Sequence, residues 1–498
     1  MPLLKISFRK LNSWPYLLLV IIVYLIVAVN SVGFHQYDEH FQIVEFANYK
    51  MGWINSSKLT WEFREKIRPG LQPFICYIVF KVCRLLGETD GYNLTLILRI
   101  ITCGVSIAVL RLFFNSYKSK ITKDLHLSFF FLVFFLWFLP YINVRFSSET
   151  WSGLFLVWTL AVIQTDKNRG EVKRFSFIGI LLGISVLLRY QSCLFVFGIT
   201  LWLILINKVK IKDIFKFGIS IILVLTIGVI IDRWLYGQFT NTFYSYFHVN
   251  IVKNVASSFG TLPWYWFLLY IIKAPGPIGV LILISFFIVL AVDPRNILLW
   301  AVTPFLLVHS AIPHKELRFL FPLASLCPLF LITAYQYVKE KYGFWLKYMS
   351  TIMVVILILF NTAGLIAIAS TGASGQVAVT NFIHRHYKNR HVNLIVNDRT
   401  DPYIEGPPLC NTFYDGRTVT RHYITTFWKE NLFKYKQPGD ANLLVLAQDD
   451  FTGPRNLKLF ENYHLVKAYQ NIPPLVEFIY RYYDNSLNNA SIWLYELK

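Results

Sequence analysis

Long apolar segments alternate with short polar segments along most of the chain. The first apolar segment, residues 14–33, follows Lys5, Arg9 and Lys10 and carries almost no charge. It is long enough to cross about 30 Å of hydrocarbon as a helix, and it is too long for a signal-peptide core. We therefore expect the first membrane span here. Further apolar segments lie at 94–114, 125–143, 150–165, 175–190, 192–206, 217–235, 263–292, 296–313, 319–338 and 347–369.

The polar segments between these spans indicate which side of a membrane each loop faces. Five of them are short and basic: 118–123, 166–174, 207–216, 293–296 and 338–343. Lys and Arg in short loops are typical of the cytoplasmic side, so the loop 34–70 and the chain after residue 370 are expected to face outward. About eleven crossings satisfy this pattern if residues 71–86, which carry Lys81 and Arg84, are re-entrant or interfacial.

The chain becomes polar after residue 370 and is interrupted by turn signals such as DRTDP, EGPP and QPGD. Short apolar segments at 392–398, 441–448 and 491–497 are expected to form strands. We therefore predict two domains. Residues 1–370 would form the transmembrane catalytic domain, including the outward loop 34–70, and residues 371–498 a small C-terminal α/β domain outside the cytoplasm.

Composition supports this interpretation. The chain is 55% hydrophobic and only 15% charged, whereas an ordinary soluble protein has roughly 25% charged residues. A soluble globular enzyme is therefore excluded, and we expect a polytopic α-helical membrane protein with about 11–12 transmembrane helices. The formal charge of +20 is explained by the basic cytoplasmic loops and the anionic lipid bilayer they meet, so no nucleic-acid partner is expected. Six cysteines without a CxxC pair indicate neither a disulfide framework nor a zinc site.

The outward loop after the first span contains candidate acid–base groups. His35, Asp38 and Glu39 would lie at the membrane surface. Adjacent carboxylates can share a proton or a cation there, and desolvation would raise their basicity, as a general base for a hydroxyl requires. An equally plausible alternative is that Asp38 caps a short helix running from Glu39 to Lys50.

A second outward loop, residues 313–322, concentrates cationic groups. His314, Lys315 and Arg318 surround Glu316. Arg offers a fork of donors and Lys a point charge, so this loop suits a lipid-linked phosphate. Ordinary snorkelling of long side chains at the interface is the alternative.

Other ionisable residues lie at outward span ends: Arg145, Glu149, Arg189, Asp232 and Arg233. Such residues are costly beside lipid unless they pair or line a cavity, so their recurrence predicts a polar cavity opening outward. The aromatic segment 236–266 includes Trp264 and Trp266, whose rings could stack on a sugar. An aromatic belt at the headgroup level would explain the same residues.

Seven short motifs carry a resemblance to a known family. They are DEHFQ (38–42), LTWEF (59–63), IRPGLQP (67–73), RFSSE (145–149), DRWLYG (232–237), SFGTLPWYWF (258–267) and HKELRF (314–319). Their order resembles the Alg9 and GPI mannosyltransferases, glycosyltransferase family 22 of the GT-C fold. The resemblance covers about residues 30–325 and is nearest to the enzymes that add a GPI mannose. Two departures from the family pattern are Tyr37, where a Pro is frequent, and the RFSSE element.

The resemblance implies an inverting mannosyltransferase. The donor would be a polyprenyl (dolichyl) phosphate mannose and the acceptor a lipid-linked glycan or GPI-like glycan. Asp38 and Glu39 would be catalytic, with Asp38 as the base, and His314, Lys315 and Arg318 would contact the donor phosphate. Further substrate contacts are expected from His35, Arg68, Arg145, Glu149, Arg189, Asp232, Trp264, Trp266 and Glu316.

No cofactor is expected to be obligatory, although an Asp–Glu pair can hold a divalent metal ion. The active site would face the lumen of the endoplasmic reticulum or the periplasm of a bacterial inner membrane. Two alternatives remain at this stage: a GT-C transferase for another lipid-phosphate-linked sugar, and a transporter or flippase of lipid-linked sugars. The polar groups gather in non-repeating loops on one side, which favours catalysis, because transporters commonly contain internal repeats.

Overall fold

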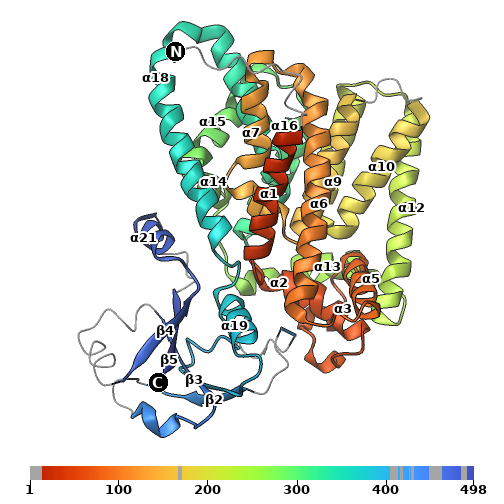
Figure 1. The fold of residues 1–498 in the computed structure, drawn as a ribbon. Coiled ribbons are helices and arrows are strands. Elements are labelled where there is room, and N and C mark those ends of the chain that lie inside the picture. The colour runs from red at the N-terminus through yellow and green to blue at the C-terminus, as the bar shows by residue number, and fades with distance from the viewer. Residues whose placement is uncertain are drawn as a thin grey trace. The chain divides into compact units, whose positions relative to one another are not determined.

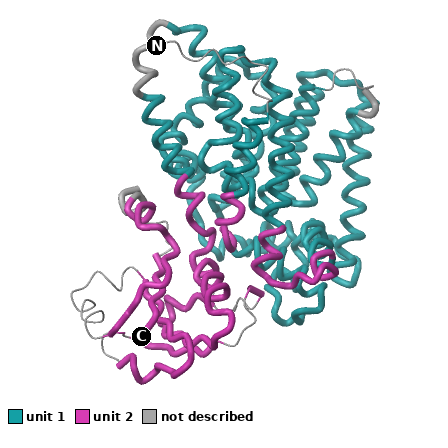
Figure 2. The backbone as a smooth tube through the Cα atoms, in the orientation of Figure 1, with its two compact units in different colours: residues 1–25, 37–81, 98–365 teal, residues 26–36, 82–97, 366–498 magenta. Residues whose placement is uncertain are grey.

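The computed structural model describes residues 14–165, 171–403, 413–414, 419–425, 427, 431–447, 463–483 and 491–498. The chain divides into two compact units (Figure 2). The first contains residues 1–25, 37–81 and 98–365, and the second contains residues 26–36, 82–97 and 366–498.

Apolar helices of different lengths, seen in Figure 1, account for most of the first unit. They are α1 (Trp14–Asn30), α6 (Gly91–Tyr117), α7 (His126–Phe135), α8 (Phe138–Asn143), α9 (Ser148–Thr165), α10 (Glu171–Leu188), α11 (Cys193–Leu205), α12 (Ile211–Tyr236), α14 (Trp266–Lys273), α15 (Pro277–Val292), α16 (Ile297–Ala311), α17 (Phe321–Ala324) and α18 (Cys327–Ser370). The helices α2 (Tyr37–Glu39), α3 (Glu45–Lys50), α4 (Trp61–Arg64), α5 (Leu71–Leu85) and α13 (Thr242–Phe247) lie between them.

Several of these helices are suited to a bilayer. Among the described residues, three are long and apolar enough to span one: Gly91–Lys120, Ile211–Tyr236 and Met353–Ser370. The pair Leu317–Ala324 and Cys327–Gly343, bent by 64°, passes the same test together, and five shorter apolar helices accompany them. The chain is therefore a helical membrane protein, as the sequence predicted. The number of 11–12 crossings stays a prediction, because length and composition alone do not select the shorter helices.

Two apolar segments that look continuous in sequence are broken helices. Within 125–143, α7 ends at Phe135 and α8 begins at Phe138. The side chain of Asn361 bridges this break, because its amide donates to the Phe135 carbonyl at 2.7 Å and its oxygen accepts from the Trp137 amide at 2.9 Å. Non-helical backbone at membrane depth is tolerated where such partners replace the lost hydrogen bonds.

The segment 263–292 is likewise divided between α14 and α15. The break contains Pro275, which has no N–H, and Gly276, which takes a positive φ of 64°. The segment 71–86 forms the amphipathic helix α5 (Leu71–Leu85), which Figure 1 shows at the same end of the bundle as α3 and α13. Its expected interfacial position in a membrane stays a prediction.

The second unit contains a five-stranded sheet of order β2-β1-β3-β5-β4. The strands are β1 (Val392–Val396), β2 (Val419–Tyr423), β3 (Ala441–Ala447), β4 (Leu465–Gln470) and β5 (Ile492–Leu497). β1 pairs in parallel with β2 and β3, whereas β5 pairs antiparallel with β3 and β4. The helix α19 (Gly375–His386) packs Val379 and Ile383 onto one face of the sheet, and α21 (Pro474–Tyr483) follows β4.

The sequence predicted the three central strands and missed the two edge strands. β1 and β3 are almost wholly buried and read as apolar runs, whereas β2 (VTRHY) and β4 (LVKAYQ) are polar and partly exposed. Edge strands carry such residues because one side of the strand meets solvent. The proposed domain boundary at residue 370 stays a prediction, since the second unit also includes the ends of α1 and α6.

Candidate active site

Carboxylates and guanidinium groups from distant parts of the first unit meet in one set of ion pairs, which we call the Asp38–Arg318 cluster. Its members are Asp38, Glu39, Glu62, Arg68, Arg145, Glu149, Arg189, Glu316 and Arg318. Eight of these nine residues were expected from the sequence to contact substrate or to take part in catalysis. The structure therefore brings together most of the residues proposed for the site.

Asp38 and Glu39, although adjacent, have different partners. The Asp38 carboxylate lies 2.6 Å from Nη1 of Arg318, whereas Nε of Arg145 donates to Glu39 at 2.7 Å. Consecutive residues of a helical turn project about 100° apart, because a helix has about 3.6 residues per turn. Glu39 and Arg145 are both buried. The structure therefore pairs each carboxylate with its own arginine, whereas the sequence suggested that the two could share a proton or a cation.

The capping alternative for Asp38 also differs from the structure. Asp38 lies inside α2 and not before it, and a π-helical turn, His40–Val44, joins α2 to α3. Such turns inside helices frequently occur at functional sites. The Asp38 side chain is about a quarter exposed, and it faces Arg318 and Arg68.

These two guanidinium groups determine the proton affinity of Asp38. Burial alone would raise the pKa of Asp38, but the positive charges of Arg318 and then Arg68 hold this pKa below its usual value. The sequence argument had expected desolvation to raise the basicity of this carboxylate. The difference arises because both arginines come from segments far along the chain, at distances that the sequence does not reveal.

Arg318 is the centre of the cluster. Its guanidinium makes a two-pronged contact with Glu316, at 2.6 and 3.1 Å, and also faces Asp38 at 2.6 Å and Glu149 at 3.8 Å. Burial alone would raise the pKa of Glu316, and the Arg318 charge lowers it. The Arg318 guanidinium thus lies beside three carboxylates, those of Asp38, Glu149 and Glu316.

A close approach between two helices brings Arg318 to Glu149. Gly153 follows Glu149 by one turn of α9, and a Cβ added to it would lie 2.7 Å from the Cα of Pro322. Pro322 follows Arg318 by one turn. The absence of a side chain at Gly153 therefore lets the start of α9 approach the segment that carries Arg318.

His314 and Lys315 occupy different surroundings from Arg318. Lys315 is buried, and its ammonium donates to the carbonyls of Leu262, at 3.1 Å, and Ile312, at 2.5 Å. Burial lowers the pKa of Lys315. Lys315 thus holds the main chain of the 258–267 segment in place, and its expected contact with a phosphate stays a prediction.

The His314 ring contacts a carboxylate and a carbonyl. Its Nε2 lies 2.8 Å from Glu316 and its Nδ1 lies 2.9 Å from the Gly260 carbonyl. His314 therefore touches the cluster through Glu316. Of the three expected phosphate contacts, the structure places Arg318 directly in the cluster.

Arg189 has more buried donor groups that make no hydrogen bond among the described residues than Arg68 or Arg318, two compared with one each. Its Nη1 donates to Glu149 at 2.5 Å, and its face lies 5.2 Å from the Phe319 ring. The Nε and Nη2 groups are buried and have no hydrogen-bond partner among the described residues. Unsatisfied buried donors on a cation suit an anionic ligand. Arg189 faces a small cavity whose lining also includes Asp38, Arg68, Tyr190, Gln191 and Tyr246.

Asp232, for which a substrate contact stays a prediction, stabilises a loop in the structure. Its carboxylate accepts from the Gly70 amide at 2.7 Å and from the Thr242 hydroxyl at 2.5 Å. A Cβ at Gly70 would lie 3.1 Å from Asp232, which accounts for the glycine in IRPGLQP. The Tyr236 hydroxyl donates to the Arg68 carbonyl at 2.7 Å. These contacts from α12 fix the loop that presents Arg68.

Neither Trp264 nor Trp266 lines the small cavity. Trp264 is 68% exposed and packs edge-on against Tyr265, and Trp266 packs against Tyr270. An exposed aromatic at a helix start is typical of an interfacial belt. His35 belongs to the short segment 26–36 of the second unit.

Glu62 is the member of the cluster that the sequence argument missed. It accepts from the Gln42 amide at 2.9 Å and lies 3.7 Å from Arg68. Glu62 stands in the LTWEF motif and Gln42 in the DEHFQ motif. The signal was therefore present in two quoted motifs, but the spacing alone did not show that they meet.

Within the part of the chain that the structure describes, no group of three or more His, Cys, Asp or Glu side chains is arranged to hold a metal ion. The cluster's carboxylates instead face arginines, as the ion pairs of Asp38, Glu39, Glu149 and Glu316 show. The charge available at this site to stabilise an anion comes from guanidinium groups.

Comparisons with known proteins agree with this architecture. The profile of the Alg9-like mannosyltransferase family matches residues 14–400. The chain is 25% identical over 311 residues to GPI mannosyltransferase 3 of Candida albicans and 27% identical over 306 residues to GPI alpha-1,2-mannosyltransferase 3 of Bos taurus. These alignments cover 62% and 59% of the chain. They span 61% and 53% of the relatives' own lengths.

The fold is also similar to a solved structure. ArnT from Cupriavidus metallidurans, in a crystal structure bound to undecaprenyl phosphate, matches with a TM-score of 0.50 at 9% identity over 98% of both chains. Its apo structure matches with a TM-score of 0.51 at 10% identity, again over 98% of both chains. This likeness confirms the expected GT-C fold with a small sheet at the C-terminus.

Proposed function

The chain belongs to the Alg9-like mannosyltransferase family, and we propose that it transfers a mannosyl group from a polyprenyl phosphate mannose to a glycan acceptor at the Asp38–Arg318 cluster. The acceptor proposed is a lipid-linked glycan of the GPI type, because the curated relatives carry that name. The reaction would take place at the lumenal or periplasmic face of the membrane.

The arrangement around Arg189 and Arg318 carries this proposal. Two buried guanidinium groups face Oε1 of Glu149, Arg189 at 2.5 Å and Arg318 at 3.8 Å. Arg189 keeps two donors without a partner among the described residues. A departing phosphate develops negative charge as the glycosidic bond breaks. Preorganised cations at that position stabilise the transition state more than the ground state. We propose that Arg189 and Arg318 bind the donor phosphate.

Asp38 is the proposed base. Its carboxylate would accept the proton of the acceptor hydroxyl while the hydroxyl oxygen attacks the anomeric carbon. The bond between that carbon and the phosphate oxygen breaks with its electron pair, so the polyprenyl phosphate leaves and the configuration inverts. The Asp38 and Glu316 side chains are each about a quarter exposed, whereas Glu39 and Glu149 are buried. Of the two exposed carboxylates, Asp38 is the one that lines the small cavity.

The pairing of Asp38 with Arg318 links donor binding to base strength. While Arg318 faces Asp38 at 2.6 Å, the carboxylate is a weak base. A phosphate that binds Arg318 adds negative charge beside Asp38, and like charge raises a carboxyl pKa. Donor binding would thus strengthen the base at the moment when it is needed.

The test compares mannose transfer by membranes containing the wild type, Asp38→Asn or Asp398→Asn. Asp398 is an exposed carboxylate of the second unit and serves as the matched control. Labelled mannose is supplied as polyprenyl phosphate mannose, with a crude glycolipid pool as acceptor. We expect Asp38→Asn to lower the rate by about 100-fold or more, the usual contribution of a general base, and Asp398→Asn to leave it unchanged.

Each other outcome would change the proposal in a defined way. Transfer that persists in Asp38→Asn would remove Asp38 as the base and keep the enzyme class. Transfer only from a different lipid-phosphate sugar would reassign the donor. Inactivity of the wild type with every lipid-linked donor would contradict the proposed activity.

A further inference from the structure

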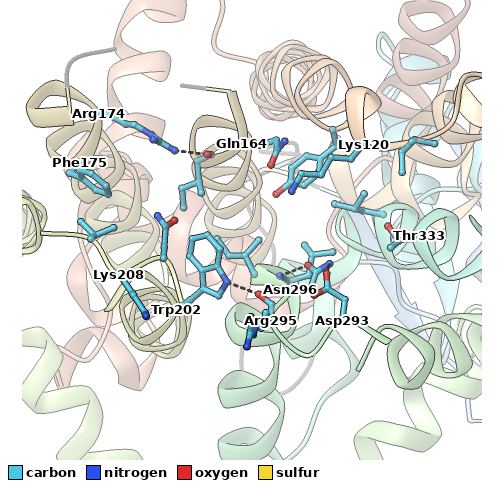
Figure 3. A pocket seen from close by; sticks show the side chains of 18 of the residues that line it. Lys120, Gln164, Arg174, Phe175, Trp202, Lys208, Asp293, Arg295, Asn296 and Thr333 are labelled. Carbon is cyan, nitrogen blue, oxygen red and sulfur yellow. Dashed lines mark hydrogen bonds between the residues drawn. The ribbon is translucent and has the colours of Figure 1, made fainter. Parts of the chain in front are cut away.

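A large cavity lies at the ends of the helices that are remote from the Asp38–Arg318 cluster (Figure 3). Its volume is about 630 Å³, within the range of about 300–1,000 Å³ that is typical of ligand sites. Gln164 at the end of α9 lines it, whereas Glu149 of the cluster stands at the start of α9. An 18-residue helix is about 27 Å long, so the two sites are separated by nearly a bilayer's hydrocarbon thickness.

Cationic side chains outnumber acidic ones in the lining of this cavity. The lining cations are Lys120, Arg174, Lys208, Lys210 and Arg295, and the lining acids are Asp213 and Asp293. The Asp213 carboxylate lies 3.3 Å from the Lys216 ammonium, and Asp293 accepts from the Asn296 amide at 3.0 Å. Both acids therefore have local partners, and the cavity has a net positive charge.

The cations come from separate segments that the fold brings together. Arg174 is half-buried at the start of α10 and donates to the Ile163 carbonyl at 2.5 Å. The Trp202 indole of α11 donates to the Arg295 carbonyl at 2.7 Å, which fixes the turn before α16 (Figure 3). Basic loops that only obey the positive-inside rule need no such convergence on a concave surface.

Apolar groups stand beside these charges. Phe175, Trp202, Ile121 and Leu329 line the same cavity as Arg174. A cavity with cationic and apolar walls fits a molecule that has a phosphate group next to hydrocarbon. Arg and Lys side chains are the usual partners of such phosphates.

We propose that this cavity binds the phosphate group of an anionic phospholipid or of a soluble organic phosphate, at the opposite end of the bundle from the catalytic cluster. The inference rests on the cavity and its charges, and it does not depend on the proposed mannosyl transfer. A lipid bound there would connect α9, α10, α11, α12 and α16 at their common end.

The test measures phosphate binding by the full chain in detergent micelles. The variant Arg174→Gln/Lys208→Gln removes two lining cations. The matched control Lys212→Gln/Lys341→Gln removes two exposed cations whose residues do not line the cavity. Native mass spectrometry counts bound phosphatidic acid, with phosphatidylcholine as the zwitterionic comparison, and a parallel titration uses glycerol 3-phosphate.

We expect the wild type and the matched control to bind one phosphatidic acid with the same affinity. The lining variant should bind it at least tenfold more weakly, while phosphatidylcholine binding is unchanged in all three. Competition by glycerol 3-phosphate at millimolar concentration would identify a soluble phosphate as the ligand source, and no competition would identify the lipid. Equal affinity of the lining variant and the matched control would overturn the proposal, as would equal binding of the two lipids.

Discussion

Asp38 and Glu39 have different partners because their side chains project about 100° apart along one helical turn. Glu39 lies in a buried ion pair with Arg145, whereas the partly exposed Asp38 faces Arg318. Both residues line the small cavity. Sequence adjacency suggested a shared role, and we propose different roles, with Asp38 as the base and Glu39 as a partner that holds Arg145.

Substitution of Glu39 and substitution of Asp38 are expected to change the free energy of unfolding by different amounts. We expect Glu39→Gln to lower the free energy of unfolding by about 3 kcal/mol, because it removes one partner of a buried ion pair. Asp38→Asn should change it by less than about 1 kcal/mol, since Arg318 keeps Glu316 and Glu149 beside it. Thermal unfolding in detergent measures both, with the exposed Glu340→Gln as the control. A larger loss for Asp38→Asn than for Glu39→Gln would contradict this assignment.

The pH dependence of transfer reports on Arg318. Since Arg318 lowers the pKa of Asp38, the carboxylate is ionised at neutral pH, and the stabilisation from their pairing is lost only as the pH falls through that lowered pKa. The acid limb of kcat/KM should therefore lie at low pH in the wild type. We expect Arg318→Gln to move it to higher pH, and Arg68→Gln to move it less.

This comparison includes its own control. Arg68 lies 3.5 Å from Asp38, compared with 2.6 Å for Arg318. Both variants lose one positive charge, so a general loss of charge would move the limb equally. An acid limb that stays in place in Arg318→Gln would show that Asp38 does not limit the reaction.

At the scale of elements, two glycines permit close contacts between segments. Gly70, in the motif IRPGLQP, accommodates Asp232 of α12, and Gly153 of α9 accommodates Pro322. Both contacts position arginines of the cluster, namely Arg68 and, through the segment before α17, Arg318. Each of these glycines marks a close approach and not a turn.

Lys315 holds the 258–267 segment in place, because its ammonium donates a hydrogen bond to the Leu262 carbonyl. We expect Lys315→Met to destabilise the chain by about 1–3 kcal/mol, because two carbonyls lose a charged donor. Limited proteolysis should then cut this segment several-fold faster. Lys253→Met, at an exposed neighbouring position, should leave the rate unchanged. If Lys315→Met instead raised the KM for the donor with unchanged proteolysis, Lys315 would be a phosphate contact.

At the scale of the whole molecule, the cluster and the large cavity occupy opposite ends of the same helices. In a membrane-spanning bundle we expect these two ends to face opposite sides. The basic segments 118–123 and 207–216 contribute Lys120, Lys208 and Lys210 to the cavity, so the positive-inside rule predicts that the cavity faces the cytoplasm.

Labelling from the two sides tests this orientation. A cysteine at Ser56, in the exposed part of the loop 34–70, should react with a membrane-impermeant maleimide only from the lumenal or periplasmic side. A cysteine at Lys212 should react only from the cytoplasmic side. Both positions are exposed, and the unsubstituted chain gives the background from its native cysteines. Labelling of both from one side would contradict the topology.

The sequence alone determined that the chain is a helical membrane protein with a small C-terminal sheet. These properties follow from the local alternation of apolar and polar residues, which sets burial and secondary structure without reference to distant contacts. The order of short motifs likewise identified the family, and the profile match confirms it. The polar edge strands and the breaks within apolar helices were missed, because partners elsewhere in the chain decide them.

Only the tertiary structure decided which charges meet. Asp38 pairs with Arg318, Glu39 with Arg145 and Glu149 with Arg189, and each pair joins segments that are distant in sequence. Side-chain direction and separation set these pairings and thereby the pKa of Asp38. The physical reason is that Coulomb energies depend on distance and burial in three dimensions, and spacing along the chain fixes neither.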